Sequence, residues 1–320
     1  MSLKYDVIIA GSYSVDLIFT GLADFPRLGK EIIGSDFKMT PGEAYIPAVC
    51  MHRLGIKVGW AADFGSDDFS QFALKSAREE GLDESLFVFH DRSYRRISVA
   101  ASYPEDRAFI TYYDPDPQVP AVISALTRVN AKVLFIPGLY SGSFTSLGKK
   151  LVSAKGMKLV MDGNSSEGDI YGKTKRSNSI RKAIKNLDIF LPNASEARRL
   201  TGEQDLLLAI NRLSVLCPCV VIKDGANGSL AYASREVIHM PSIQVDPVDT
   251  TGAGDNFNSG FLRAWLDGKS ISECLLWGNI VGGLSTTVIG GTVRKISYAN
   301  VIGYLAEQEN IPGKYNPKIH

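Results

Sequence analysis

The strongest constraint on the fold is a repeated alternation between short apolar runs and helix-like segments. Residues 5–11, 57–65, 132–138 and 158–164 each form a short run rich in apolar residues that closes on glycine or asparagine. Such runs are typical of strands buried on both faces of a parallel sheet. Residues 67–81, which begin with an acidic cap and stop at a glycine, have the pattern of an intervening helix. The alternation predicts a doubly wound, mostly parallel sheet with helices on both faces.

Two segments interrupt this alternation and predict a small accessory sheet. Residues 30–40 and 94–113 are strand-like, and the second segment contains two runs separated by turn-forming residues at 104–106. Arg95, Arg96 and Arg107 belong to this region. They could meet an anionic substrate, but exposed strand-edge charges that discourage aggregation are the favoured interpretation.

Charge and length exclude several classes of protein. A chain of 320 residues can hold two average domains or one large α/β domain. The net charge of +1 gives no basic footprint for nucleic acid or an anionic membrane. The sequence contains neither an apolar run of membrane-spanning length nor a signal-peptide pattern at its start, so we expect a cytoplasmic protein with no nucleic-acid or membrane partner.

Residues 248–261, VDTTGAGDNFNSGF, join a turn and a run of small residues to the start of an amphipathic helix. The first N–H groups of a helix have no intrahelical partner, and the helix dipole adds partial positive charge there. Gly252, Ala253 and Gly254 leave this backbone uncovered, which predicts an anion site that a phosphate can approach. Asp255 then has two interpretations of equal weight: it accepts the proton of an attacking hydroxyl, or it is a first-turn acid complementing the dipole.

Other polar positions have ordinary structural explanations when the residues are taken alone. Asp16 follows the first strand at the edge where ligands gather in such sheets, but a turn aspartate is the favoured interpretation. Asn193 and Glu196 have the spacing of a helix capping box. Hairpin chemistry explains the glycines at 225 and 228, and Asn279 fits either a buried amide or a ligand contact.

The run DTTGAGDNF at residues 249–257 closely resembles the C-terminal signature of the PfkB carbohydrate kinase family, the ribokinase-like sugar and nucleoside kinases. The resemblance extends in order along essentially the whole chain. It implies one ribokinase-like kinase domain over residues 1–320, folded as a three-layer αβα sandwich with a mostly parallel central sheet. A small β-sheet lid would be formed by insertions at about 30–40 and 94–113. Such a lid often serves as a dimerisation surface, so a homodimer through the lid is one expectation.

The resemblance also implies roles for individual residues. Gly252, Ala253 and Gly254 would form the anion hole for the transferred phosphoryl group, and Asp255 would be the catalytic base. On the acceptor side, Asp16 and Gly42 would contact the sugar together with Asp255. The positions that match nucleotide-binding residues for ATP are Asn193, Lys223, Gly225, Gly228 and Asn279.

Two kinds of metal site are implied in the same way. Glu196 would organise Mg²⁺, usually through water. Asp249 and Thr251 match part of a site that in this family often holds a monovalent cation such as K⁺.

The segment at 41–55 departs from the family pattern. Ile46 stands where a sugar-binding asparagine is usual, and Glu43 and Pro47 are also unusual there. An isoleucine removes the donors and acceptors that a polyol needs, so the acceptor is not fixed by the resemblance.

The predicted activity is ATP-dependent phosphorylation of a hydroxymethyl group of a sugar or related small polyol. The alternatives are a nucleoside kinase of the same fold and a non-catalytic ligand sensor. The absence of the motif G-x-x-x-x-G-K-[ST] weighs against a P-loop ATPase.

Overall fold

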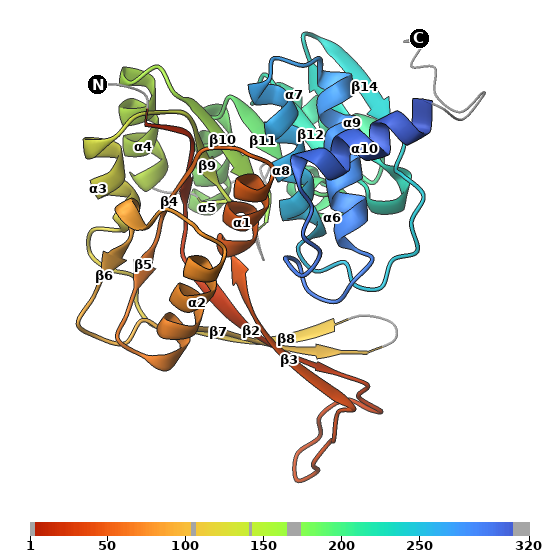
Figure 1. Cartoon of the computed structure of the whole chain (residues 1–320). Helices are drawn as coiled ribbons and strands as arrows, with labels where there is room; N and C mark the ends of the chain where they lie inside the picture. The colour runs from red at the N-terminus through yellow and green to blue at the C-terminus, as the bar shows by residue number, and fades with distance from the viewer. Residues whose placement is uncertain (1–3, 104–106, 141–142, 165–173, 310–320) are drawn as a thin grey trace.

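The computed structural model describes residues 4–103, 107–140, 143–164 and 174–309. The described residues form a central eight-stranded sheet (Figure 1). In spatial order its strands are β14 (Glu236–Met240), β13 (Ser229–Ala233), β12 (Val220–Lys223), β11 (Ile189–Leu191), β10 (Lys158–Asp162), β9 (Ala131–Ile136), β1 (Tyr5–Ala10) and β4 (Val58–Ala61). The strands from β12 to β4 pair in parallel, whereas β13 and β14 add an antiparallel hairpin at one edge.

Helices cover both faces of this sheet because successive residues of each strand point to opposite sides. Val7 and Ile9 of β1 pack into one core, and Ile8 packs into the other. The first core includes residues from α1 (Tyr45–Arg53), α2 (Asp68–Glu79), α8 (Ala253–Leu266), α9 (Ile271–Ser285) and α10 (Tyr298–Glu309). The second includes residues from α3 (Ala121–Arg128), α4 (Ser143–Ala154), α5 (Lys175–Lys185), α6 (Ala194–Thr201) and α7 (Leu206–Ser214). The three-layer architecture predicted from the sequence is confirmed.

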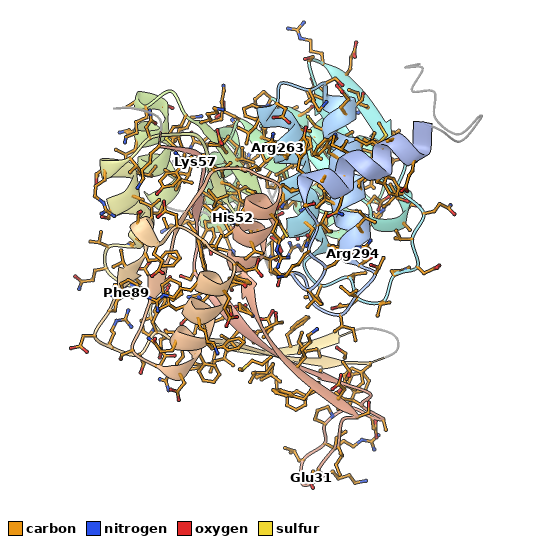
Figure 2. The ribbon with its side chains drawn as sticks, viewed as in Figure 1. Glu31, His52, Lys57, Phe89, Arg263 and Arg294 are labelled. Carbon is orange, nitrogen blue, oxygen red and sulfur yellow. The ribbon has the colours of Figure 1, made fainter. Side chains whose placement is uncertain are left out.

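A separate four-stranded sheet projects from this body as a lid (Figure 1). Its strands in spatial order are β3 (Asp36–Glu43), β2 (Tyr13–Thr20), β7 (Arg96–Ser102) and β8 (Arg107–Tyr113). Figure 2 shows Glu31, in the loop between β2 and β3, at the tip farthest from the central sheet. A further small sheet pairs β5 (Asp63–Phe64) with β6 (Val88–Phe89), just after the short 3₁₀ helix η1 (Glu84–Leu86).

The accessory sheet is present, but its strands differ from the predicted segments. β3 begins at residue 36 instead of residue 30, and β2 was not predicted at all. The pairing partners explain this, because β2 obtains its backbone hydrogen bonds from β3 on one side and β7 on the other. The predicted turn at residues 104–106 lies outside the described residues.

Close packing of α8 against α9 fixes the helix that follows the glycine-rich loop. A methyl group added at Gly260 would lie 2.5 Å from the carbonyl oxygen of Trp277, and one added at Gly278 would lie 2.7 Å from the ring of Phe257. The two helices therefore approach at positions where only glycine fits. In the parts of the chain that the structure describes, no helix is both long and apolar enough to span a membrane.

Candidate active site

The segment at 252–254, predicted to bind an anion and called the anion loop below, lies at the start of α8. Gly252 is the N-cap residue and has a left-handed φ of 71°. A methyl group added there would meet the Cα of Gly291 at 3.0 Å and Cδ1 of Ile46 at 3.1 Å, so both conformation and space require glycine. The Ala253 N–H donates to the Thr250 carbonyl at 3.2 Å. The next first-turn amides, at residues 254 and 255, have no acceptor within the helix and are the natural donors to an anion.

Asn256 ties this loop to two other segments, a role that the sequence reasoning missed. Its buried amide donates to the carbonyl of Gly252 at 2.9 Å and to that of Gly291 at 2.8 Å. Its oxygen accepts from the thiol of Cys50 on α1 at 2.8 Å. The sequence signal for this role was the amide side chain itself, which stands two positions after Gly254 inside the apolar pattern of the helix. The loop is therefore held on both sides by a fully used side chain.

Ile46 explains part of the unusual segment at 41–55. It lies on the first turn of α1, is buried, and packs beneath Gly252 and Gly291. The isoleucine thus supports the anion loop with apolar contact.

Asp255 lies on the first turn of α8 with a strongly perturbed carboxyl group. Burial, with a smaller contribution from the nearby charge of Asp162, raises its pKa to about 8. The Lys223 ammonium acts in the opposite direction, while Glu196 and Glu43 add smaller repulsions. Positive charge brought to this site lowers the pKa and favours the ionised carboxylate.

A buried ion pair lies directly beside the anion loop. Lys223, the last residue of β12, places Nζ 2.5 Å from Oδ2 of Asp162, the last residue of β10. The same ammonium donates to Asn258 Oδ1 at 3.3 Å, and the Asn258 amide donates to Asp162. A methyl group added at Gly254 would lie only 3.4 Å from Lys223 Nζ. The sequence reasoning identified Lys223 but missed Asp162 and Asn258. The position of Asp162 at the carboxyl end of a parallel strand was the available signal.

Asn193 and Glu196 form the capping box expected from their spacing. The Glu196 N–H donates to Asn193 Oδ1 at 2.8 Å, and the Asn193 N–H donates to Glu196 Oε2 at 2.7 Å. Burial raises the pKa of Glu196, and the Asp162 charge adds to the shift. In the described parts of the chain, no group of three or more His, Cys, Asp or Glu side chains is arranged as a metal cage.

The hairpin after β12 has the tight backbone that its glycines predicted. Gly225 begins the 3₁₀ turn η2 (Gly225–Asn227) with φ 54°, and Gly228 follows it with φ 91°. A methyl group at Gly228 would lie 2.1 Å from the carbonyl oxygen of Met240. Asn279 of α9 donates to the carbonyls of Met240 and Pro241 at 3.1 and 2.9 Å. Asn279 therefore fixes the segment that packs on the hairpin.

Asp249 and Thr251 lie close together before the anion loop. Asp249 Oδ1 accepts from the N–H and the hydroxyl of Thr251 at 2.9 and 2.6 Å, and Oδ2 accepts from the Gly290 N–H at 2.8 Å. Lys38 of the lid donates to the carbonyl of Ile289 at 2.6 Å in the same loop.

Asp16 of β2 lies beside Gly42 of β3, which is paired with Ser14. Asp16 accepts from the Ser14 hydroxyl at 2.8 Å, and burial raises its pKa to about 6. A methyl group at Gly42 would lie 2.4 Å from Asp16 Oδ2, so glycine is needed to leave room for the carboxylate. Asp16 opens onto a cavity of about 370 Å³ between the lid and residues 247–251. The structure therefore places Asp16 and the anion loop at the same side of the molecule.

The interpretation of Arg96 as an exposed strand-edge charge is wrong. β7 is an interior strand of the lid sheet, and Arg96 is only 8% exposed. Its neighbour Arg95 points to the opposite face and pairs with Asp114 at 2.9 Å.

Comparison with known proteins agrees with this geometry. The model of the pfkB family carbohydrate kinases matches residues 7–296. A ribokinase of Bacillus subtilis is 24% identical over 290 residues, covering 89% of this chain and 94% of the relative. A nucleoside kinase of Methanothermobacter thermautotrophicus is 27% identical over 285 residues, covering 86% and 87%. The structure of Arabidopsis thaliana ribokinase complexed with ribose and ATP superposes with a TM-score of 0.78 at 20% identity, covering 95% of this chain and 99% of that one.

Proposed function

Because the chain belongs to the pfkB family of carbohydrate kinases, we propose that it transfers the γ-phosphoryl group of ATP to a hydroxymethyl group of a sugar or related polyol. The observation that carries the proposal is the first turn of α8, where Asp255 and the Gly254 backbone lie beside the Lys223 ammonium. A proton acceptor, an anion-binding backbone and a buried cation are the parts that phosphoryl transfer needs.

In the proposed reaction the acceptor hydroxyl oxygen attacks the γ-phosphorus in line. The bond from phosphorus to the bridging oxygen of ATP breaks, ADP leaves, and the hydroxyl proton passes to Asp255. The amides of residues 254 and 255 and the Lys223 ammonium stabilise charge on the transferred oxygens. Asp255 positions the hydroxyl as well as accepting its proton.

Mg²⁺ fits this site on charge grounds. The charge of Asp162 raises the pKa values of Glu196 and Asp255, Glu196 adds to the shift at Asp255, and the Lys223 ammonium acts against both. A cation relieves that repulsion. We assign Glu196 to hold the ion through water. When bound, Mg²⁺ neutralises charge on the phosphate oxygens.

The other proposed contacts to ATP lie on and around the hairpin that follows β12. We assign Asn193, Lys223, Gly225 and Gly228 to the phosphates and sugar of ATP, and Asn279 to the border of the adenine pocket. Gly225 and Gly228 have positive φ, and neither has a side chain that would come between the backbone and the nucleotide. We also propose a monovalent-cation site at Asp249 and Thr251. Activity that rises with KCl at constant ionic strength, compared with choline chloride, supports it.

Asp16 and Gly42 form the acceptor side of the proposal. Asp16 is a hydrogen-bond acceptor on the cavity wall, which suits sugar hydroxyls. The nucleoside kinase relative keeps a nucleoside as the second candidate acceptor. Two apolar side chains exposed on the lid, Phe37 and Ile110, support a homodimer through the lid, which light scattering on the purified protein tests.

The experiment is an ADP-release screen with Mg-ATP against pentoses, hexoses, keto-deoxy sugar acids and nucleosides, with Asp255→Asn in parallel. We expect turnover with at least one acceptor and its loss by a factor of about 10³ or more in the variant, as befits removal of an essential group. ATP or acceptor binding without turnover in any combination would favour the non-catalytic sensor instead.

A further inference from the structure

Glu43 occupies an unusual backbone position at the acceptor side of the cleft. It is the last residue of β3, follows Gly42 directly, and has a left-handed φ of 51°. In the described parts of the chain only Ser234 and Arg235, in the turn between β13 and β14, share this feature without being glycine. A residue with a side chain is strained in this conformation, so a charged side chain here points to a use for the carboxylate.

The Glu43 carboxylate is held by two groups of the lid. Tyr113 donates its hydroxyl to Glu43 Oε1 at 2.7 Å. Arg96 places Nε 3.5 Å from Glu43 Oε2, and its guanidinium lies 4.0 Å from the centre of the Tyr113 ring. Arg96 also pairs with Asp116 at 3.2 Å. None of the described residues accepts a hydrogen bond from Arg96 Nε, although the side chain is buried.

The charge of Glu43 reaches both ends of the proposed acceptor site. It contributes to the raised pKa of Asp16 and to that of Asp255. Glu43 and Asp116 therefore both pair with the buried Arg96 guanidinium, and Asp16 lies beside Gly42, the residue before Glu43. A negatively charged acceptor would be repelled by the excess of negative charge here. Arg96, the cation that could bind it, is already paired with two carboxylates.

We propose that Glu43 sets the acceptor class: by engaging Arg96 and Tyr113 it excludes sugar acids and other anionic acceptors, and it restricts the kinase to neutral ones. This inference rests on the proposed function. It adds a specificity-determining residue, acting by repulsion of the wrong acceptor, to the residues that bind the right one.

A purely structural role for the pair is the alternative, since it also joins β3 to β7. The variant Glu43→Gln separates the two roles. Glutamine keeps the shape, the backbone conformation and an oxygen for the Tyr113 hydroxyl, but it lacks the charge. Asp114→Asn is the matched control, because Asp114, directly after β8, pairs with Arg95, directly before β7.

The test compares kcat/KM for a neutral acceptor and for its aldonic acid, beginning with D-ribose and D-ribonate. We expect the wild type to favour the neutral acceptor. Glu43→Gln should raise the ratio of acid to neutral kcat/KM by about tenfold or more, because a like charge in the site is removed. The gain should disappear in Glu43→Gln/Arg96→Met, and Asp114→Asn should leave the ratio within about twofold, as for a change outside the site.

An unchanged ratio in Glu43→Gln, or a wild type that already prefers the acid, overturns the inference even though the kinase proposal stands. If no variant phosphorylates any acceptor, the kinase proposal fails, and the melting temperature with D-ribonate and D-ribose becomes the readout. A stabilisation by D-ribonate that appears only in Glu43→Gln supports the inference. Its absence refutes it.

Discussion

Replacing Lys223 by methionine removes the buried ammonium while keeping most of the side-chain volume. The partners Lys223 Nζ and Asp162 Oδ2 are 2.5 Å apart, with side chains only 10% and 6% exposed. Two unit charges at this separation attract by about 7 kcal/mol at an effective dielectric constant of about 20. Desolvation offsets part of that attraction, and leaving Asp162 buried without its partner should lower the free energy of unfolding by about 3–5 kcal/mol.

The same substitution should reduce catalysis for a separate reason. Lys223 Nζ lies beside Gly254, where the transferred phosphate is expected. Losing this charge should lower kcat/KM by about 10²–10³, the usual cost of one preorganised group at a developing negative charge. Because Lys223 lowers the pKa of Asp255, its removal should also move the rise of activity with pH to higher pH.

The double variant Lys223→Met/Asp162→Asn distinguishes the two effects. It removes the unpaired charge, so chemical denaturation should show that most of the lost stability returns. Coupled ADP-release assays should show that activity does not return with it. Recovery of activity together with stability would mean that Lys223 serves the fold alone, and a stable single variant would contradict the argument from burial.

Three further predictions concern Asp255, Gly42 and Asn256. The folded-state pKa of Asp255 is about 8 against an ordinary 3.8, so ionisation is disfavoured in the fold and wild-type stability is lost as pH rises from about 4 to about 8. The melting temperature of Asp255→Asn minus that of the wild type should therefore increase with pH across that window and stay constant above it. A difference that does not change with pH would contradict the assigned burial. Gly42→Ala should displace the Asp16 carboxylate and raise the KM for the acceptor about tenfold or more. The KM for ATP should stay within about twofold of the wild-type value. Equal effects on both KM values would place Gly42 outside the acceptor side. Asn256→Ala removes three hydrogen bonds, two to loop carbonyls and one from the Cys50 thiol, and should lower the free energy of unfolding by about 2–4 kcal/mol in urea titrations. A loss below about 0.5 kcal/mol would show that these bonds are not needed.

Local patterns were sufficient for the layered architecture, whereas most candidate site residues came from the resemblance to a kinase family. Continuous apolar runs identified the strands around residues 5–11 and 132–138, and the small-residue run at 252–254 predicted an anion site at the start of a helix. The lid strand β2 was missed because its segment lacks a strict alternation and is stabilised by pairing with two distant strands. Likewise, the sequence identified Lys223 as a candidate site residue but did not identify its partners Asp162 and Asn258.

The sequence by itself determined the alternation of strands and helices in the central sheet, the glycine-bearing turn at 225–228, and the acid that follows the small-residue run at 252–254. These follow from hydrophobic period and backbone sterics, which act over a few residues. Only the tertiary structure decided that Arg96 is buried against Glu43, that Ile46 supports Gly252, and that Asp162 meets Lys223 across the sheet. Those contacts join residues 50 or more positions apart. Their electrostatics depend on desolvation by surroundings that no local pattern encodes.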